Sequence, residues 1–244
     1  ASDQLMAPPF PGLSQKSPRF ELLLHGNSLS FRGGFFGLCN VVLVWDSRGE
    51  PILFDTGHFC VRSSLVAALA RKGIAPADLK HVFLSHLHFD HCHNVDLFPA
   101  ASIYVSAREL EYAAAPASGD IYVPWKIREL LEERHLVPLP EEGEVLSGLR
   151  HFAVPGHTPG SQALAFTDAS GKNVVLAGDA IKYPREVMAL RSDQSFGSAD
   201  DSAASIVRIL DSADIVVPGH FPVLFKRGSG WLWDEPASIE LLVR

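Results

Sequence analysis

The chain has 244 residues, a formal net charge of −7 and a composition that is 47% hydrophobic and 20% charged. A chain of this kind buries a full core, so intrinsic disorder is excluded. The acidic balance argues against nucleic acid and anionic membranes as partners, and no apolar run reaches the ~18 residues that a membrane helix needs. The cysteines Cys39, Cys60 and Cys92 form no paired framework, which favours a reducing, cytoplasmic setting.

The first half of the chain predicts an α/β protein. Residues 1–18 are rich in Pro and Ser and are expected to form an extended arm, and they lack the charged-then-apolar layout of a secretory signal. Residues 19–244 are expected to form a single domain. Apolar runs bounded by turn residues predict strands over 20–26, 40–46, 51–57, 81–85 and 101–106, with a helix over 61–73.

The segment 107–142 differs from its surroundings. It combines a helix over 107–115, a loop and a short amphipathic helix over 125–135, and we interpret it as an insertion or lid within the single domain. Strand-like runs then resume. We predict strands over 150–154, 162–168, 173–179 and 214–220, with a helix over 200–213.

A cluster of ionisable side chains follows the strand-like run "HVFLS". Residues 85–94 read "SHLHFDHCHN" and contain His86, His88, Asp90 and His91. Burying imidazoles and a carboxylate beside such a strand is costly unless something pairs with them. Side chains at i and i+2 of an extended chain point the same way, so His86 and His88 can bind one ion together. Asp90 and His91, where the chain turns out of the strand, can face a second.

Four further polar side chains stand at the ends of apolar runs: Asp55 in "FDTG", His157 in "PGHTPG", Asp179 in "AGDA" and His220 in "PGHFP". Loops at the carboxyl ends of strands converge on one site in an α/β sheet. Three histidines and a shared carboxylate for one ion, with Asp90, His91, His220 and the same carboxylate for the other, complete a two-metal centre. Such ligands suit zinc, which we take as the default, and also iron, manganese or cobalt.

The motif "HLHFDH" matches the HxHxDH pattern of the metallo-β-lactamase superfamily, and the downstream histidines and aspartate occur in that family's order. The chain resembles this family over essentially its whole length. The resemblance implies an αββα sandwich, with two mixed sheets flanked by helices and the metal site at one edge. It implies these ligands: His86, His88 and His157 for the first ion, Asp90, His91 and His220 for the second, and Asp179 as the bridge. Asp55 resembles the family's aspartate that orients a ligand histidine.

The resemblance also implies an activity. Two ions that share a water lower its pKa toward ~7, which supplies a metal-bridging hydroxide as the nucleophile. Asp90 is expected to be catalytic, because it positions that nucleophile and carries a proton to the leaving group. The bridging Asp179 disfavours a true β-lactamase. The strings "SHLHFDH" and "VPGHTPGSQALAF" are similar to acyl-homoserine lactonases. We therefore expect a lactonase-like enzyme that opens a lactone or cleaves a carboxylic ester of a hydrophobic small molecule.

Two alternatives stay open. A metal-dependent phosphodiesterase or nuclease uses the same metals, but such enzymes usually bring basic surfaces for phosphates, and this chain is acidic. A mononuclear-iron sulfur dioxygenase or a thioesterase is the other; the dioxygenases share part of the pattern but have an incomplete second site. By analogy with related lactonases, a homodimer is also expected.

The substrate contacts are predicted from fewer signals. The lactonases carry a tyrosine three residues after the bridging aspartate, where this chain has Lys182 and places Tyr183 one position later. We expect Tyr183 to be catalytic by contacting the substrate carbonyl, with Lys182 as the alternative contact. Four aromatic side chains, two on the glycine-flexed hairpin "FRGGFFG" and two in the insertion, are predicted to line an apolar pocket: Phe35, Phe36, Tyr122 and Trp125.

Overall fold

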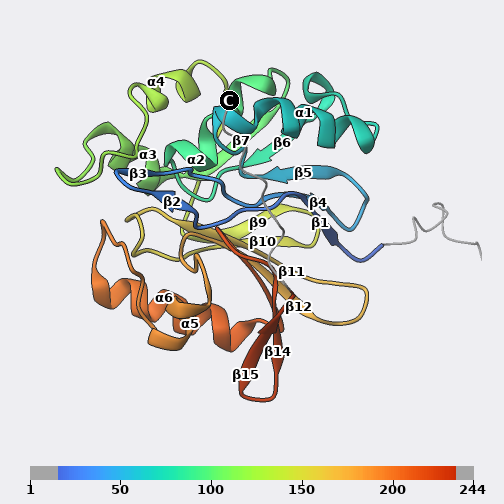
Figure 1. Ribbon diagram of the computed structural model, residues 1–244. Helices are drawn as coiled ribbons and strands as arrows, with labels where there is room; N and C mark the ends of the chain where they lie inside the picture. Colours follow the sequence, from blue (N-terminus) through green and yellow to red (C-terminus); the bar gives the residue numbers. More distant parts are fainter. Residues whose placement is uncertain (1–15, 235–244) are drawn as a thin grey trace, which may run out of the picture.

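Two β-sheets lie face to face, and helices cover the outer face of each (Figure 1). The computed structural model describes residues 16–234, so residues 1–15 of the predicted N-terminal arm lie outside the described part. The order helix, sheet, sheet, helix confirms the predicted αββα sandwich. Within the described residues, no helix is both long and apolar enough to cross a membrane.

The first sheet has six strands in the order β1-β4-β5-β6-β7-β8. The pairs β1/β4 and β4/β5 are antiparallel and the pairs from β5 to β8 are parallel, so the sheet is mixed. Its strands are β1 (Arg19–Leu24), β4 (Val41–Trp45), β5 (Pro51–Phe54), β6 (His81–Phe83), β7 (Ser102–Ser106) and β8 (His135–Leu139). Its outer face carries α1 (Arg62–Arg71), α3 (Ala107–Ala114) and α4 (Ile127–Glu132).

The second sheet has seven strands in the order β15-β14-β13-β12-β11-β10-β9. Only β12 and β13 pair in parallel; the other neighbours are antiparallel. Its strands are β9 (Glu142–Leu146), β10 (Leu149–Ala153), β11 (Gln162–Thr167), β12 (Asn173–Gly178), β13 (Ile215–Pro218), β14 (Leu224–Arg227) and β15 (Gly230–Trp233). Its outer face carries α6 (Ala199–Ser212), and α5 (Pro184–Ala189) lies beside it.

Side chains alternate along the central strands and so build three apolar layers. On β4, Val41 and Leu43 pack toward the helices of the first sheet, whereas Val42 and Val44 pack against the second sheet. β12 divides its side chains in the same way between the layer shared by the sheets and the layer under α6. Strands buried on both faces explain why these segments read as continuous apolar runs in the sequence.

Some elements depart from the prediction. The sequence does not predict β8, β9, α5 or the hairpin of β14 and β15. β8 lies inside the predicted insertion over 107–142, yet it pairs in parallel with β7 as a regular edge strand. Its Pro138 argues against a strand in the sequence, but proline is tolerated at the edge of a sheet. Only the part of the insertion before β8 therefore stands outside the sheets.

The remaining elements lie in the loops around the candidate site. A two-stranded hairpin of β2 (Ser30–Phe31) and β3 (Gly34–Phe35) confirms the hairpin predicted at "FRGGFFG", with Gly33 at φ +98° in its turn. The helix α2 (Phe89–Cys92) follows β6, and three short 3-10 turns occur at Phe59–Val61, Pro76–Asp78 and Val95–Leu97. Together with the carboxyl ends of β5, β6, β12 and β13, the hairpin and α2 enclose one edge of the sandwich.

Candidate metal centre

Every predicted metal ligand lies in a segment that follows a strand, and all of them are buried. The loop after β6 and the helix α2 provide four: His86, His88, Asp90 and His91. The loops after β10, β12 and β13 provide the other three: His157, Asp179 and His220. Segments far apart in the chain thus bring their polar side chains to one edge of the sandwich, as the sequence predicts.

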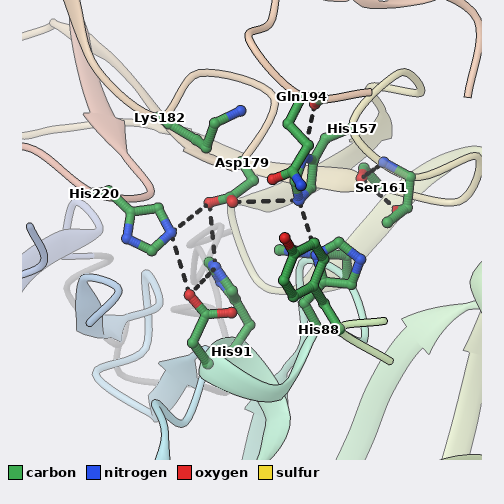
Figure 2. Close-up of polar contacts among 12 residues, drawn as sticks. His88, His91, His157, Ser161, Asp179, Lys182, Gln194 and His220 are labelled. Carbon is green, nitrogen blue, oxygen red and sulfur yellow. Dashed lines mark hydrogen bonds and ion pairs between the residues drawn. The ribbon is translucent and has the colours of Figure 1, made fainter. Parts of the chain in front are cut away.

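The ligand atoms form three groups, and within each group all atoms lie within 4.8 Å of one another: His86, His88 and His157; His86, His91 and Asp179; Asp90, His91 and His220. The Asp179 carboxylate stands between the first of these groups and the third (Figure 2). Its Oδ2 lies 3.3 Å from Nε2 of His157, and its Oδ1 lies 3.2 Å from Nε2 of both His91 and His220. This placement suits a carboxylate that bridges two ions.

Hydrogen bonds fix the tautomers of the histidines. The Ser85 hydroxyl donates its single hydrogen to Asp55, so it accepts from Nδ1 of His86, 3.0 Å away. Asp55 likewise accepts from Nδ1 of His91 at 2.8 Å. Nε2 of both rings, together with Oδ1 of Asp179, is buried and has no hydrogen-bond partner. Buried polar atoms without a partner are rare and costly, and two bound divalent ions, with Asp179 between them, would give all three a partner.

A second observation concerns the first predicted ion alone. Nδ1 of His88 lies 3.0 Å from Nε2 of His157. The opposite nitrogen of each ring faces an oxygen acceptor, Asp120 for His88 and the Gln194 carbonyl for His157, so the protons sit there. Two lone pairs then face each other at close range, and they repel unless a cation offsets them. The residues present therefore fit a metal ion of the first predicted group.

Burial and charge set the protonation of the cluster. Burial holds the pKa values of His86 and His157 well below the ordinary histidine value, so both rings are neutral, the form that binds a metal. Burial would lower the pKa of His220 as well, but Asp179 and Asp90 raise it. Burial opposes the charge of Asp179, yet the histidines around it hold its pKa well below the usual range, so it stays ionised.

The comparison with known families agrees with this geometry. The model described as "Metallo-beta-lactamase superfamily" matches residues 34–220, which contain every predicted ligand. The chain belongs to the metallo-β-lactamase superfamily. The family and the buried histidine and aspartate groups together make it a metal-dependent hydrolase.

Two kinds of named relative are similar to this chain. The metallo-beta-lactamase domain-containing protein 1 of Xenopus laevis is 31% identical over 82% of this chain and 78% of that protein. The human protein of that name is 35% identical over 72% of this chain, but the match spans only 59% of the human protein. The N-acyl homoserine lactonase AttM of Rhizobium radiobacter is 31% identical over 78% of this chain and 72% of that protein.

Solved structures agree with the fold. A quorum-quenching N-acyl homoserine lactone lactonase superposes with a TM-score of 0.65 at 25% identity, covering 85% of this chain and 93% of that one. A probable metal-dependent hydrolase from Staphylococcus aureus gives a TM-score of 0.72 at 14% identity, covering 92% and 99%. The latter likeness shows the superfamily fold alone.

A cleft of about 190 Å³ opens at the candidate metal centre. Phe35, Phe89 and Tyr122 lie along one side, with Phe35 and Tyr122 in edge contact at 5.4 Å between ring centroids. Lys182 and Tyr183 lie among the other lining residues. The cleft thus joins an apolar wall to a polar floor.

Two predicted pocket residues are not brought to this cleft. Trp125 is 87% exposed and lines a separate surface depression between α3 and α4. Phe36 packs against Phe31 on the hairpin, at 5.6 Å between centroids, and is absent from the cleft lining. Of the four predicted wall residues, the structure thus brings Phe35 and Tyr122 to the cleft and places Trp125 and Phe36 elsewhere. A loop segment has no periodicity that tells which way its side chains point.

Lys182 and Tyr183 use their polar atoms differently. The Tyr183 hydroxyl donates to Asp193, which Arg185 also contacts. Lys182 is only 7% exposed, and its ammonium lies 2.7 Å from Oε1 of Glu186 and 3.0 Å from the Ser192 hydroxyl. A hydroxyl has one donor hydrogen and an ammonium has three. The lysine therefore keeps a donor beyond these two contacts, whereas the tyrosine does not.

The sequence reasoning missed two buried carboxylates that hold the ligand loops. Glu109 of α3 is fully buried and accepts from Leu87 N at 2.9 Å, Thr158 Oγ1 at 2.7 Å and Gly160 N at 3.1 Å. It thereby joins the loop of His86 and His88 to the loop of His157. Asp120 accepts from Nε2 of His88 at 2.9 Å. Neither carboxylate belongs to a recognisable motif, and only the fold brings them to the site.

Proposed function

We propose that this protein is a lactonase-like hydrolase that opens a lactone or cleaves a carboxylic ester of a hydrophobic small molecule. The observation that carries the proposal is the position of the ligand cluster at the floor of a cleft with an aromatic wall. The likeness to N-acyl homoserine lactonases in sequence and in structure supports the same reaction class.

The chemistry divides between bound metal and protein. When bound, a pair of divalent ions supplies an acidified water and polarises the oxygen of the scissile carbonyl. Asp90 lines the cleft beside the other predicted ligands, with its Oδ2 3.4 Å from Nε2 of His220. We assign to this carboxylate the orientation of the attacking water and the transfer of its proton to the alcohol oxygen that leaves when the acyl C–O bond breaks.

A hydrogen-bond donor to the substrate carbonyl completes the assignment. The analogy with the lactonases assigns this role to Tyr183, but the Tyr183 hydroxyl already donates its hydrogen to Asp193. We therefore propose that the free donor of the Lys182 ammonium contacts the substrate, and that the Tyr183 ring serves as a wall. Tyr183→Phe distinguishes the two, because it removes only the hydroxyl. A kcat within about twofold of wild type supports Lys182, whereas a loss of roughly 100-fold identifies the tyrosine as the donor.

The charge of the cleft bears on the phosphodiesterase alternative. Among the described residues that line it, Lys182 is the one lysine or arginine, and Glu186 balances its charge. A phosphodiester carries a negative charge, and apart from the metal ions themselves the described lining offers it no uncompensated lysine or arginine. A neutral ester or lactone suits this cleft better.

The test is proton release by zinc- or manganese-loaded protein with γ-lactones, acyl-homoserine lactones, aryl esters, a thioester and a phosphodiester. Turnover of a lactone or ester that falls by several orders of magnitude in Asp90→Asn supports the proposal. Turnover of the phosphodiester or the thioester alone would replace it with the corresponding hydrolase. Near-wild-type turnover in Asp90→Asn, with both metals bound, would refute the role given to Asp90.

A further inference from the structure

Asp120 is buried in a segment that is otherwise open to solvent. It is 8% exposed, although Ile121 beside it is 81% exposed and residues 117–119 are exposed as well. Its carboxylate reaches Nε2 of His88, 32 positions earlier in the chain, at 2.9 Å. A single buried carboxylate in an exposed segment points to a specific partner, and that partner is a predicted metal ligand.

Several hydrogen bonds hold Asp120 in this place. The Tyr112 hydroxyl, from α3, donates to Oδ2 at 2.7 Å, and the Tyr122 backbone N–H donates to Oδ1 at 3.0 Å. The Tyr122 carbonyl in turn accepts from the backbone N–H of Phe89, the first residue of α2, at 2.9 Å. The segment is thus fastened to the ligand loop by its backbone as well as by the carboxylate.

The contact matters because His88 is oriented differently from the other ligand histidines. The Nδ1 atoms of the other four have oxygen acceptors, Ser85, Asp55, Gln194 and Leu38, which leave Nε2 for the site. His88 is reversed: its Nε2 faces Asp120, and its Nδ1 faces the site, 3.0 Å from Nε2 of His157. Turning the ring over would put carbon atoms where the two nitrogens now lie, so something must hold the ring in this one orientation.

We propose that Asp120 is a positioning residue of the metal centre. Its carboxylate holds the Nε2–H tautomer of His88 and fixes the ring with Nδ1 toward the first ion, and Tyr112 holds the carboxylate. The segment from Tyr112 to Tyr122 is accordingly part of the metal centre and not a lid that opens freely. This inference rests on the metal-binding part of the proposed function and on no particular substrate.

The first experiment measures metal affinity, not turnover. Metal-free wild type, Asp120→Ala, Asp120→Asn and Tyr112→Phe are titrated with zinc against a chromophoric chelator. The matched control is Glu111→Gln, which also neutralises a carboxylate, but an exposed one, on α3 next to Tyr112. Loss of a partner that orients a ligand weakens metal binding by about 10- to 100-fold. We expect that loss for Asp120→Ala, smaller losses for Asp120→Asn and Tyr112→Phe, and none for the control.

A second readout separates positioning from stability. In the zinc-loaded protein, nitrogen NMR of the histidine rings reports which nitrogen of His88 carries the proton. We expect Nε2–H in wild type and loss of that single tautomer in Asp120→Ala, while the Tm of the metal-free protein changes no more than in the control. Wild-type affinity and tautomer in Asp120→Ala would overturn the proposal. An affinity loss explained by a lower Tm of the metal-free protein would overturn it too, by making Asp120 a structural residue. Neither readout depends on finding the substrate.

Discussion

The Asp55 carboxylate accepts a hydrogen bond from Nδ1 of His91 at 2.8 Å, and this turns Nε2 of that ring toward Asp179, 3.2 Å away. Asp55 also accepts from the backbone N–H and the hydroxyl of Ser85, the residue before His86. One buried side chain at the end of β5 therefore orients ligands of both predicted ions. The role that the resemblance implies for Asp55 agrees with this geometry.

Replacing Asp55 tests the arrangement. Asp55 has φ +59°, a conformation that asparagine also adopts more readily than most residues. We expect Asp55→Asn to keep the backbone but to weaken metal binding by about 10- to 100-fold, because a neutral amide holds His91 less firmly. Chelator competition measures this loss. Asp55→Ala adds backbone strain, so it should also lower the free energy of unfolding; equal metal affinity in wild type and Asp55→Asn would contradict the role.

Gly219 gives a second prediction, because the bridging carboxylate occupies the place of its missing side chain. A Cβ at this position would lie 2.0 Å from Oδ1 of Asp179 and 3.0 Å from the Gly178 carbonyl oxygen. Gly219→Ala must therefore displace Asp179, and we expect kcat/KM to fall by about 100-fold or more. Gly230→Ala on β15 is the control, because the nearest atom to a Cβ built there, the Arg227 carbonyl oxygen, lies 3.8 Å away. Metal content should fall in the first variant and stay unchanged in the second.

Glu109 gives a prediction about stability. Its buried carboxylate accepts three hydrogen bonds that join two ligand loops, and hydrogen bonds to charged groups contribute about 1.5–3 kcal/mol each. We expect Glu109→Gln to lower the free energy of unfolding of the metal-free protein by about 2–4 kcal/mol, because an amide N–H₂ then faces donors. Urea denaturation measures this. Glu111→Gln, exposed on the same helix, should change stability by less than about 0.5 kcal/mol.

The architecture and the ligand cluster were predictable because their signals are local. Apolar runs such as "NVVLVWD" and "NVVLAGD" indicate strands buried on both faces, and the structure has β4 and β12 there. His86, His88, Asp90 and His91 share one short segment, so their spacing alone suggests a common partner. The rest of the cluster could be placed because strands of an α/β sheet end at the same edge.

The supporting residues were not predictable for the opposite reason. Asp120 and Glu109 act across 32 and 22 to 51 positions of sequence, and nothing next to them in the chain indicates a partner. Trp125 is the opposite case, because its residue type and its place in the insertion suggested a pocket wall, yet its side chain is 87% exposed. The positions of Asp120, Glu109 and Trp125 depend on tertiary contacts, which residue type alone does not indicate.

The aromatic wall gives a prediction about substrate preference. Phe35 contacts Tyr122 and Phe89 along the cleft, whereas Trp125 lies in a different depression. Under the proposed function, we expect Phe35→Ala to raise KM about tenfold for the most hydrophobic substrate, because about 1.5 kcal/mol of apolar contact is lost. Trp125→Ala should leave KM unchanged and serves as the matched aromatic control. An equal effect of the two variants would argue against the cleft as the acyl-binding site.

Metal removal gives the last prediction, which depends on no substrate. Folding alone leaves Nε2 of His86 and of His91 without partners in the buried cluster, so metal-free protein carries a cost that bound ions relieve. At a free metal concentration about 1,000 times Kd, one ion stabilises the folded state by about 4 kcal/mol, and 1 kcal/mol raises the Tm of a domain of this size by roughly 2–4 °C. We therefore expect zinc to raise the Tm of chelator-treated protein by about 10 °C.

This zinc-dependent rise in Tm should shrink as the pH falls. Burial lowers the pKa of His220, but Asp179 and Asp90 raise it more, and the proton that His220 then binds competes with the metal. His86→Ala with His91→Ala is the comparison; if that double variant showed the same zinc-dependent rise as wild type, the ions would bind elsewhere.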